Sequence, residues 1–191
     1  MKKKFFAGLV LAGTLAASVL VSLPAAAAPD TAAADPAWEK FASARRVFQI
    51  RLAELAARRW PEYTGFFTAH RNLQLAYIER RNVVFYYLKE HDPARIVRDH
   101  GGEAFLSFSW KPEEEKIFAK EIPGYEALTG EIAALKAKTD RFKYRDVLKD
   151  RFSRLEIDPE YLALMRDMSR SIGEGERTLA KAAASLRPKE K

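Results

Sequence analysis

The chain has 191 residues, and its 33 lysine and arginine residues exceed its 26 aspartate and glutamate residues, which gives a formal net charge of +7. It contains no cysteine, so disulfides, haem attached through a CxxCH motif and a lipid anchor on cysteine are all excluded. Three of the lysines belong to a predicted leader, and the smaller positive excess that remains does not indicate a nucleic-acid-binding protein.

Residues 1–27 are typical of a secretory signal peptide. Lysines at positions 2–4 precede an apolar run over residues 5–23, and small residues follow Pro24. We place the cleavage after Ala27, which directs the mature protein to the periplasm or to secretion. An uncleaved inner-membrane anchor is the alternative, because the apolar run is nearly long enough to span a bilayer.

Residues 28–35 are small and polar, and we expect them to form a disordered tether. Asp35-Pro36 is a helix-start signal, because aspartate caps a helix N-terminus and proline fits the first helical position. Apolar residues then recur at spacings of three, four and seven, which predicts a helix from Pro36 to about Arg59. Pro61 ends this helix, since proline disfavours helical backbone in the residue before it.

The longest amphipathic pattern covers residues 62–90. One line of its helical wheel contains five apolar residues, namely Phe66, Leu73, Tyr77, Val84 and Leu88. Together with flanking apolar residues they cover more than half of the circumference, which predicts a central helix packed by neighbours on several sides. We expect a turn at residues 60–65 to fold the first two helices into a hairpin. A single kinked rod is the alternative.

The next segment is short and contains mixed signals. Asp92-Pro93 repeats the helix-start signal, which predicts a short helix from Pro93 to Asp99 that stops at Gly101-Gly102. Residues 103–110 (EAFLSFSW) alternate as in a strand, but the rest of the chain offers no partner strand. We therefore interpret them as an irregular aromatic segment over one end of a helical bundle.

Two further helices follow. Pro112 precedes three glutamates, which predicts a helix start, and Pro123-Gly124 ends that helix. The next helix begins at Tyr125 and runs to about Lys138, or alternatively continues as far as Leu155.

Asp158-Pro159 opens the last helix, whose apolar residues repeat at spacings of three, four and seven up to Leu186. Gly173 and Gly175 interrupt this pattern, and glycine inside a helix is unfavourable. Gly175 lies on the apolar line, so it either permits the close approach of another helix or marks a local break.

Four to five main helices with short connections predict an all-α fold, an antiparallel helical bundle, in a single domain over residues 36–186. A domain of about 150 residues is large enough to bury one core. A basic tail covers residues 187–191. No run after the leader is apolar enough for a transmembrane span.

Four polar residues of the central helix are candidates for a ligand pocket: His70, Tyr77, Arg80 and Arg81. In the functional interpretation they bind an anionic ligand. In the structural alternative they form a polar network that fixes the register of the helices, and the arginines then need carboxylate partners. Suitable partners by residue type are Glu54, Glu131 and Asp146.

Five arginines make the first helix a candidate docking surface: Arg45, Arg46, Arg51, Arg58 and Arg59. Such a surface can bind an anionic envelope surface or a protein partner through its charge. The alternative is an ordinary solvated helix face.

The sequence gives little support for a metal site or for catalysis. His91 and His100 flank the predicted short helix and would lie about 12 Å apart, too far to share one ion. The chain has no GxSxG motif and no glycine-rich loop of the kind that binds phosphate. We therefore expect neither a metal nor a cofactor.

These observations favour an exported protein of the cell envelope that acts by binding or by protein–protein interaction, not by catalysis. The expected partner is an envelope protein, an anionic envelope surface or a ligand of the central helix, and nucleic acid is not expected. Two alternatives stay open: an enzyme whose site is assembled around the central-helix polar residues, and a structural homo-oligomer joined through the last helix.

Overall fold

A computed structural model describes residues 34–100, 103–106, 108–142, 151 and 153–185. Its main helices are α1 (Ala34–Arg59), α2 (Thr64–His91), α3 (Glu115–Glu121), α4 (Tyr125–Asp140) and α6 (Pro159–Ser185). The predicted all-helical class, with about five main helices packed against each other, is confirmed. The predicted signal peptide, most of the tether and the basic tail lie outside the described residues.

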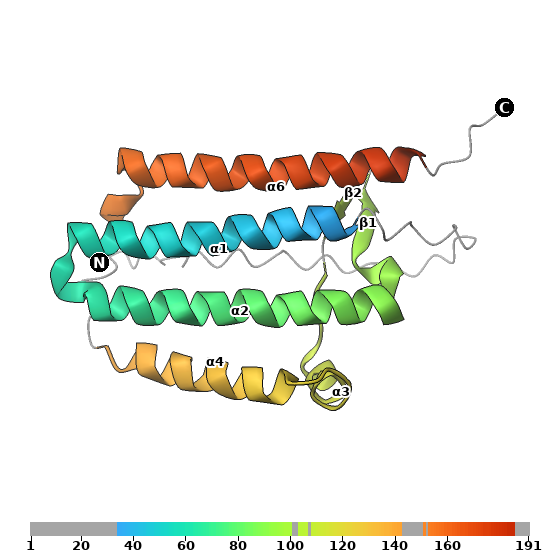
Figure 1. Ribbon diagram of the computed structural model, residues 1–191, viewed down its shortest axis with the longest axis horizontal. Helices are drawn as coiled ribbons and strands as arrows, with labels where there is room; N and C mark the ends of the chain where they lie inside the picture. The colour runs from blue at the N-terminus through green and yellow to red at the C-terminus, as the bar shows by residue number, and fades with distance from the viewer. Residues whose placement is uncertain (1–33, 101–102, 107, 143–150, 152, 186–191) are drawn as a thin grey trace, which may run out of the picture.

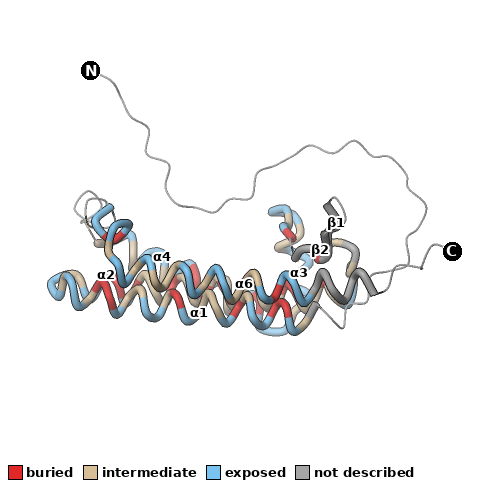
Figure 2. Tube along the Cα trace, turned by 90° about the horizontal axis from the view of Figure 1, so that it is seen from above, coloured by how far each residue is buried: buried red, intermediate tan, exposed pale blue. Residues whose placement is uncertain are grey.

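The four long helices lie side by side in one row, in the order α6, α1, α2, α4 (Figure 1). Helix α1 packs on both α6 and α2, and α2 also packs on α4. The colour gradient of Figure 1 shows that each helix runs opposite to its neighbours in the row. Helix α3 and a small β-hairpin stand on one side of the row, as Figure 2 shows from above. In the described part of the chain, no helix is long and apolar enough to span a bilayer.

The hairpin of the first two helices is confirmed. Helix α1 ends at Arg59, as predicted, and a 3₁₀ helix (Pro61–Tyr63) forms the turn before α2 begins. At the other end α1 begins at Ala34, two residues before the predicted start, so Asp35 lies inside the helix. The Asp35 carboxylate instead pairs with the Lys89 ammonium of α2 at 2.5 Å.

Helix α2 has neighbours on two sides, and its apolar line is covered. Leu73 and Val84 are buried, and Phe66 and Tyr77 are half-buried. Leu73 packs with Ile132 of α4, whereas Val84 belongs to a larger core shared with α1. The helix is therefore central in the row, although neighbours do not enclose it all the way round.

The predicted helix over residues 93–99 is wrong. A 3₁₀ helix (Pro93–Arg95) leads into strand β1 (Val97–His100), which pairs in antiparallel register with β2 (Glu103–Leu106). The partner strand that the sequence seemed to lack therefore lies just before Gly101-Gly102. The pairing of these two strands replaces the helix that the local pattern favours.

An aromatic core lies where the hairpin meets the helical row. The Trp38 and Phe85 rings stack with their centroids 4.6 Å apart, and the Phe108 ring lies 5.4 Å from Trp38. The Trp38 indole donates a hydrogen bond to the Asn82 side chain at 2.8 Å, which satisfies its only polar group. Phe108 is buried, so it covers this part of the core.

Helices α3 and α4 end close to the residues that the sequence predicts. Helix α3 ends at Glu121, and Gly124 has a φ of +79°, a conformation that glycine adopts without strain. Helix α4 ends at Asp140, so the alternative of one continuous helix to Leu155 is wrong, although residues 143–150 lie outside the described part.

The last helix begins as predicted. The Asp158 carboxylate accepts hydrogen bonds from the backbone N–H groups of Glu160 at 2.8 Å and Tyr161 at 3.3 Å, which caps α6. The helix continues through both glycines, so the local break is wrong. A Cβ atom at Gly175 would lie 3.0 Å from the Ala37 carbonyl oxygen, so Gly175 permits the close approach of α1.

Candidate functional site

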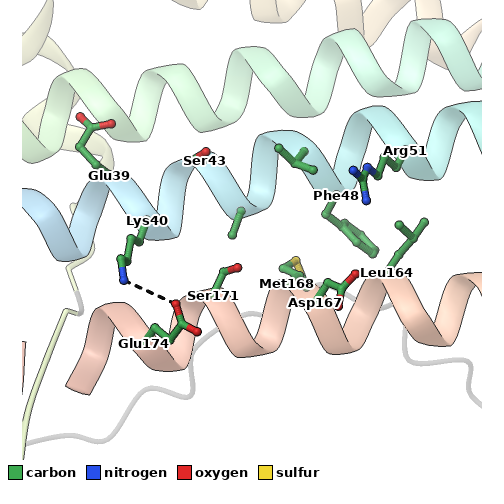
Figure 3. A pocket seen from close by; sticks show the side chains of 12 residues that line it. Glu39, Lys40, Ser43, Phe48, Arg51, Leu164, Asp167, Met168, Ser171 and Glu174 are labelled. Carbon is green, nitrogen blue, oxygen red and sulfur yellow. Dashed lines mark ion pairs between the residues drawn. The ribbon is translucent and has the colours of Figure 1, made fainter. Parts of the chain in front are cut away.

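An open groove with a volume of about 530 Å³ runs between α1 and α6 (Figure 3). Its apolar lining consists of Ala44, Val47, Phe48, Leu164 and Met168. Its polar lining consists of Glu39, Lys40, Ser43, Arg51, Asp167, Ser171 and Glu174. The groove therefore combines an apolar surface with charged groups on both helices, which is the usual composition of a protein binding site.

Side-chain size explains why the groove lies where it does. At one end Gly175 brings α6 against the backbone of Ala37. Beyond that contact, Ser43 on α1 and Ser171 on α6 have small side chains, which leave space between the two helices. Farther along, the larger rings of Phe48 and Tyr161 meet with their centroids 6.2 Å apart.

An ion pair crosses the groove at one end, whereas at the other end an acidic side chain pairs within its own helix. The Lys40 ammonium lies 3.5 Å from the Glu174 carboxylate, so one ion pair links α1 to α6 (Figure 3). At the opposite end the Asp167 carboxylate lies 3.7 Å from Arg170, which is on its own helix. Between these ends Val47 is 45% exposed, although it is aliphatic. The groove thus presents apolar surface to solvent between two charged ends.

The four residues of the predicted ligand pocket do not all come together. His70 stacks on Phe66 with ring centroids 5.8 Å apart, and burial lowers the pKa of its imidazole. It precedes Arg80 by ten residues, which corresponds to about 15 Å along the helix. Tyr77 lies against the Arg80 guanidinium, which is 5.4 Å from the ring centroid. The structure therefore groups Tyr77 with the arginines and places His70 elsewhere.

Arg80 belongs to a polar network that the sequence did not reveal. Its guanidinium lies 3.7 Å from the Glu115 carboxylate, so the partner is none of the acidic residues considered above. Glu115 also accepts hydrogen bonds from the Trp110 indole at 2.6 Å and from the Tyr125 hydroxyl at 2.5 Å. These contacts tie α2, α3 and α4 together.

Arg81 shares one neighbour with Arg80, because both guanidinium groups lie over the Trp110 ring, at 5.8 Å and 5.5 Å from its centroid. Its guanidinium lies 4.6 Å from the Phe108 ring centroid and donates a hydrogen bond to the Phe108 carbonyl oxygen at 3.1 Å. Burial lowers the pKa of Arg81, and the positive charges of Arg45 and Arg80 lower it further. Within the described part of the chain, no carboxylate forms an ion pair with Arg81.

The five arginines of the predicted docking surface have different surroundings. Arg46 pairs with Glu79 of α2 at 2.9 Å, Arg58 pairs with Glu160, and Arg59 pairs with Asp158 at 3.1 Å. These acidic partners reduce the net positive charge of the surface.

Arg45 and Arg51 differ from those three. The Arg45 guanidinium lies 5.3 Å from the Phe41 ring centroid, and burial lowers its pKa. Arg51 is exposed and lines the groove between α1 and α6.

Two features, the α6 wall of the groove and the role of Glu115, could not be predicted from the sequence. The α6 wall of the groove, with Leu164 and Met168, was visible only as an apolar helix stripe, because the register of α6 on α1 is not encoded locally. Glu115 was interpreted only as one of three acids after a helix-start proline. None of these three residues carries a sequence signal that identifies its partner.

Comparison with known proteins identifies no relative of this chain, so its function is inferred from the geometry alone. Protein-family models, curated proteins and solved structures all give no match to this chain. In the described residues, no group of three or more histidine, aspartate or glutamate side chains is arranged to hold a metal ion.

Proposed function

We propose that this protein is exported to the cell envelope and binds a protein partner in the groove between α1 and α6. The partner presents an amphipathic helix, and the protein has no catalytic role. The observation that carries the proposal is the apolar surface of the groove, which is open to solvent at Val47 and bordered by charged residues. An exposed apolar surface with a polar border is typical of a protein–protein interaction site.

The length of the groove supports a helical partner. Its lining on α1 extends from Glu39 to Arg51, which corresponds to about 18 Å at 1.5 Å per residue. A partner helix of three to four turns has this length, and it would present apolar residues at positions i, i+3 or i+4, and i+7. On α6 the lining contains two acidic residues, Asp167 and Glu174, and no basic residue, so basic side chains on the partner complement that wall.

The composition of the groove supports binding over catalysis. Its two serines, Ser43 and Ser171, are its only hydroxyl side chains, and no histidine lines it. A serine nucleophile needs an adjacent base to become reactive. The groove contains polar groups suited to orienting a partner, and its lysine, Lys40, is already paired with Glu174.

A site-specific cross-linking experiment tests this function. A photoreactive phenylalanine derivative at Ser43 places the probe in the groove, and the same derivative at Ala127, exposed on α4, is the matched control. We expect a discrete cross-linked product in cells from position 43 only. Introducing Val47→Asp should reduce its yield about tenfold, because a charge replaces an apolar contact of about 1.4 kcal/mol.

The mass of the product distinguishes the alternatives. A product with twice the mass of the chain would favour the homo-oligomer over a different protein partner. Identical products from both positions, or no product from position 43, would contradict the proposal. In the homo-oligomer, Gly175 is not available for close packing between copies, because it already contacts Ala37 of its own chain.

A further inference from the structure

Arg45 of α1 lies one residue before Arg46, which pairs with Glu79 of α2, and Arg81 lies two residues after Glu79. The two arginines are therefore at the same level of the α1–α2 pair, and in the described part of the chain no carboxylate pairs with either. We infer that these two arginines form a binding site for an oxyanion, namely phosphate or the phosphate group of a larger molecule. The site is independent of the groove between α1 and α6, because neither arginine lines that groove. Arg45 belongs to the predicted docking surface, and Arg81 belongs to the predicted ligand pocket.

The first argument is the unused hydrogen-bonding capacity of both side chains. A guanidinium has five N–H donors. Arg81 donates one hydrogen bond, to the Phe108 carbonyl oxygen, and its Nε is buried without a partner. Arg45 donates no hydrogen bond within the described residues, and its guanidinium lies over the Phe41 ring. Because the buried Nε–H of Arg81 has no partner and such a donor is costly, an acceptor within its reach stabilises the folded chain.

The second argument is the local charge. Arg46 is neutralised by Glu79, and Glu115 is already shared by Arg80, Trp110 and Tyr125. In the described part of the chain, Arg45 and Arg81 therefore have no acidic partner. Two half-buried positive charges repel each other, and an anion between them removes that repulsion.

The third argument is that the site is held in place before any ligand binds. Arg45 lies over the Phe41 ring and Arg81 over the Phe108 ring. Both rings pack on Trp38, with centroid distances of 5.1 Å and 5.4 Å. One aromatic cluster thus positions both guanidinium groups, and paired planar donors match the oxygens of a phosphate group.

Thermal unfolding of the mature protein in inorganic phosphate tests the site, with chloride at equal ionic strength as the reference. We expect phosphate to raise the Tm of the wild type, because a ligand that binds only the folded state stabilises it. Arg45→Met should abolish this shift. Arg46→Met removes a neighbouring positive charge that has its own partner, so this matched control should retain the shift.

The behaviour in chloride makes the test independent of folding defects. Arg45→Met keeps the aliphatic stem over Phe41 and removes the repulsion, so its Tm in chloride should equal or exceed that of the wild type. A clearly lower Tm would mean that Arg45 already has a stabilising partner within the chain, and it would overturn the inference. A phosphate shift of equal size in Arg45→Met and wild type would overturn it as well.

A vesicle experiment identifies the source of the phosphate group. Cosedimentation with phosphatidylglycerol vesicles that is lost in Arg45→Met would show that the site takes a lipid headgroup. A phosphate-dependent Tm shift without cosedimentation would show that it takes a soluble phosphate compound. If Arg45→Met changes neither the phosphate-dependent Tm shift nor the cosedimentation with vesicles, the two arginines do not form this site.

Discussion

The charged side chains of α1 and α2 differ mainly in whether a carboxylate lies within reach. Arg46 and Lys89 have acidic partners at 2.9 Å and 2.5 Å, whereas Arg45 and Arg81 have aromatic neighbours instead. Exposed ion pairs contribute little to stability, about 0–1 kcal/mol each. The residues without partners are therefore the more informative ones for function.

One carboxylate should make the stability of the protein depend on pH. The Arg95 guanidinium donates hydrogen bonds to both Glu114 carboxylate oxygens, at 2.6 Å and 2.9 Å, and the Lys111 backbone N–H donates a third at 2.7 Å. These contacts, chiefly the hydrogen bonds from Arg95, lower the pKa of Glu114 from 4.5 to about 2. The folded state therefore favours the ionised carboxylate, which stabilises it at pH values above the unfolded pKa.

We expect this contribution to disappear as the pH falls from about 4.5 to about 2, with a loss of about 1–2 kcal/mol after solvent screening. The measurement is the free energy of unfolding in urea as a function of pH for the wild type and Glu114→Gln. The difference between the two proteins should shrink toward acid pH. Parallel curves over this range would show that Glu114 does not carry the effect.

The contact between α1 and α6 depends on one glycine. Gly175→Leu places side-chain atoms against the Ala37 backbone, so it should destabilise the protein by about 1–3 kcal/mol, the usual cost of overpacking. Gly173→Leu is the matched control, because the atom nearest to a Cβ there is the mobile end of the Arg177 side chain, at 3.5 Å. That control should be neutral or stabilising, since leucine favours helix more than glycine does.

Chemical unfolding of both variants measures the difference. Equal effects of the two substitutions would mean that helix propensity, and not the approach of α1, determines the role of Gly175. The result also matters for the proposed binding groove, because the Gly175 contact sets the separation of its two walls.

Three Asp-Pro pairs show how far local signals predict the elements. Asp158 caps α6 as expected, because capping needs only its own neighbours. Asp35 lies within α1, and Asp92 leads into a 3₁₀ helix and a strand. The last difference arises because pairing between Val97–His100 and Glu103–Leu106 replaces the helix that the local pattern favours.

The candidate sites were less predictable than the helices for the same reason. The groove depends on Phe48 lying opposite Tyr161, and the proposed arginine site depends on Arg45 and Arg81 lying at the same level of the α1–α2 pair. Both arrangements involve residues far apart in the chain. The sequence named Arg45 and Arg81 as candidates by residue type and could not show that they are neighbours.

At the scale of the whole molecule, export is the prediction that determines where a partner is found. We expect the mature protein to begin at Ala28, because small residues follow the apolar run and suit cleavage there. Intact mass measurement of the periplasmic fraction checks this directly. A full-length chain in the membrane fraction would instead favour the uncleaved anchor.

The open row of helices gives each helix a small set of neighbours. Helix α6 packs on α1 and β2, and α4 packs on α2 and α3, so each outermost helix is supported from one side of the row. Helix α1 therefore takes part in two separate interfaces, one with α6 and one with α2. The groove lies at the interface with α6 and the two arginines at the interface with α2, so a partner in one proposed site leaves the other accessible.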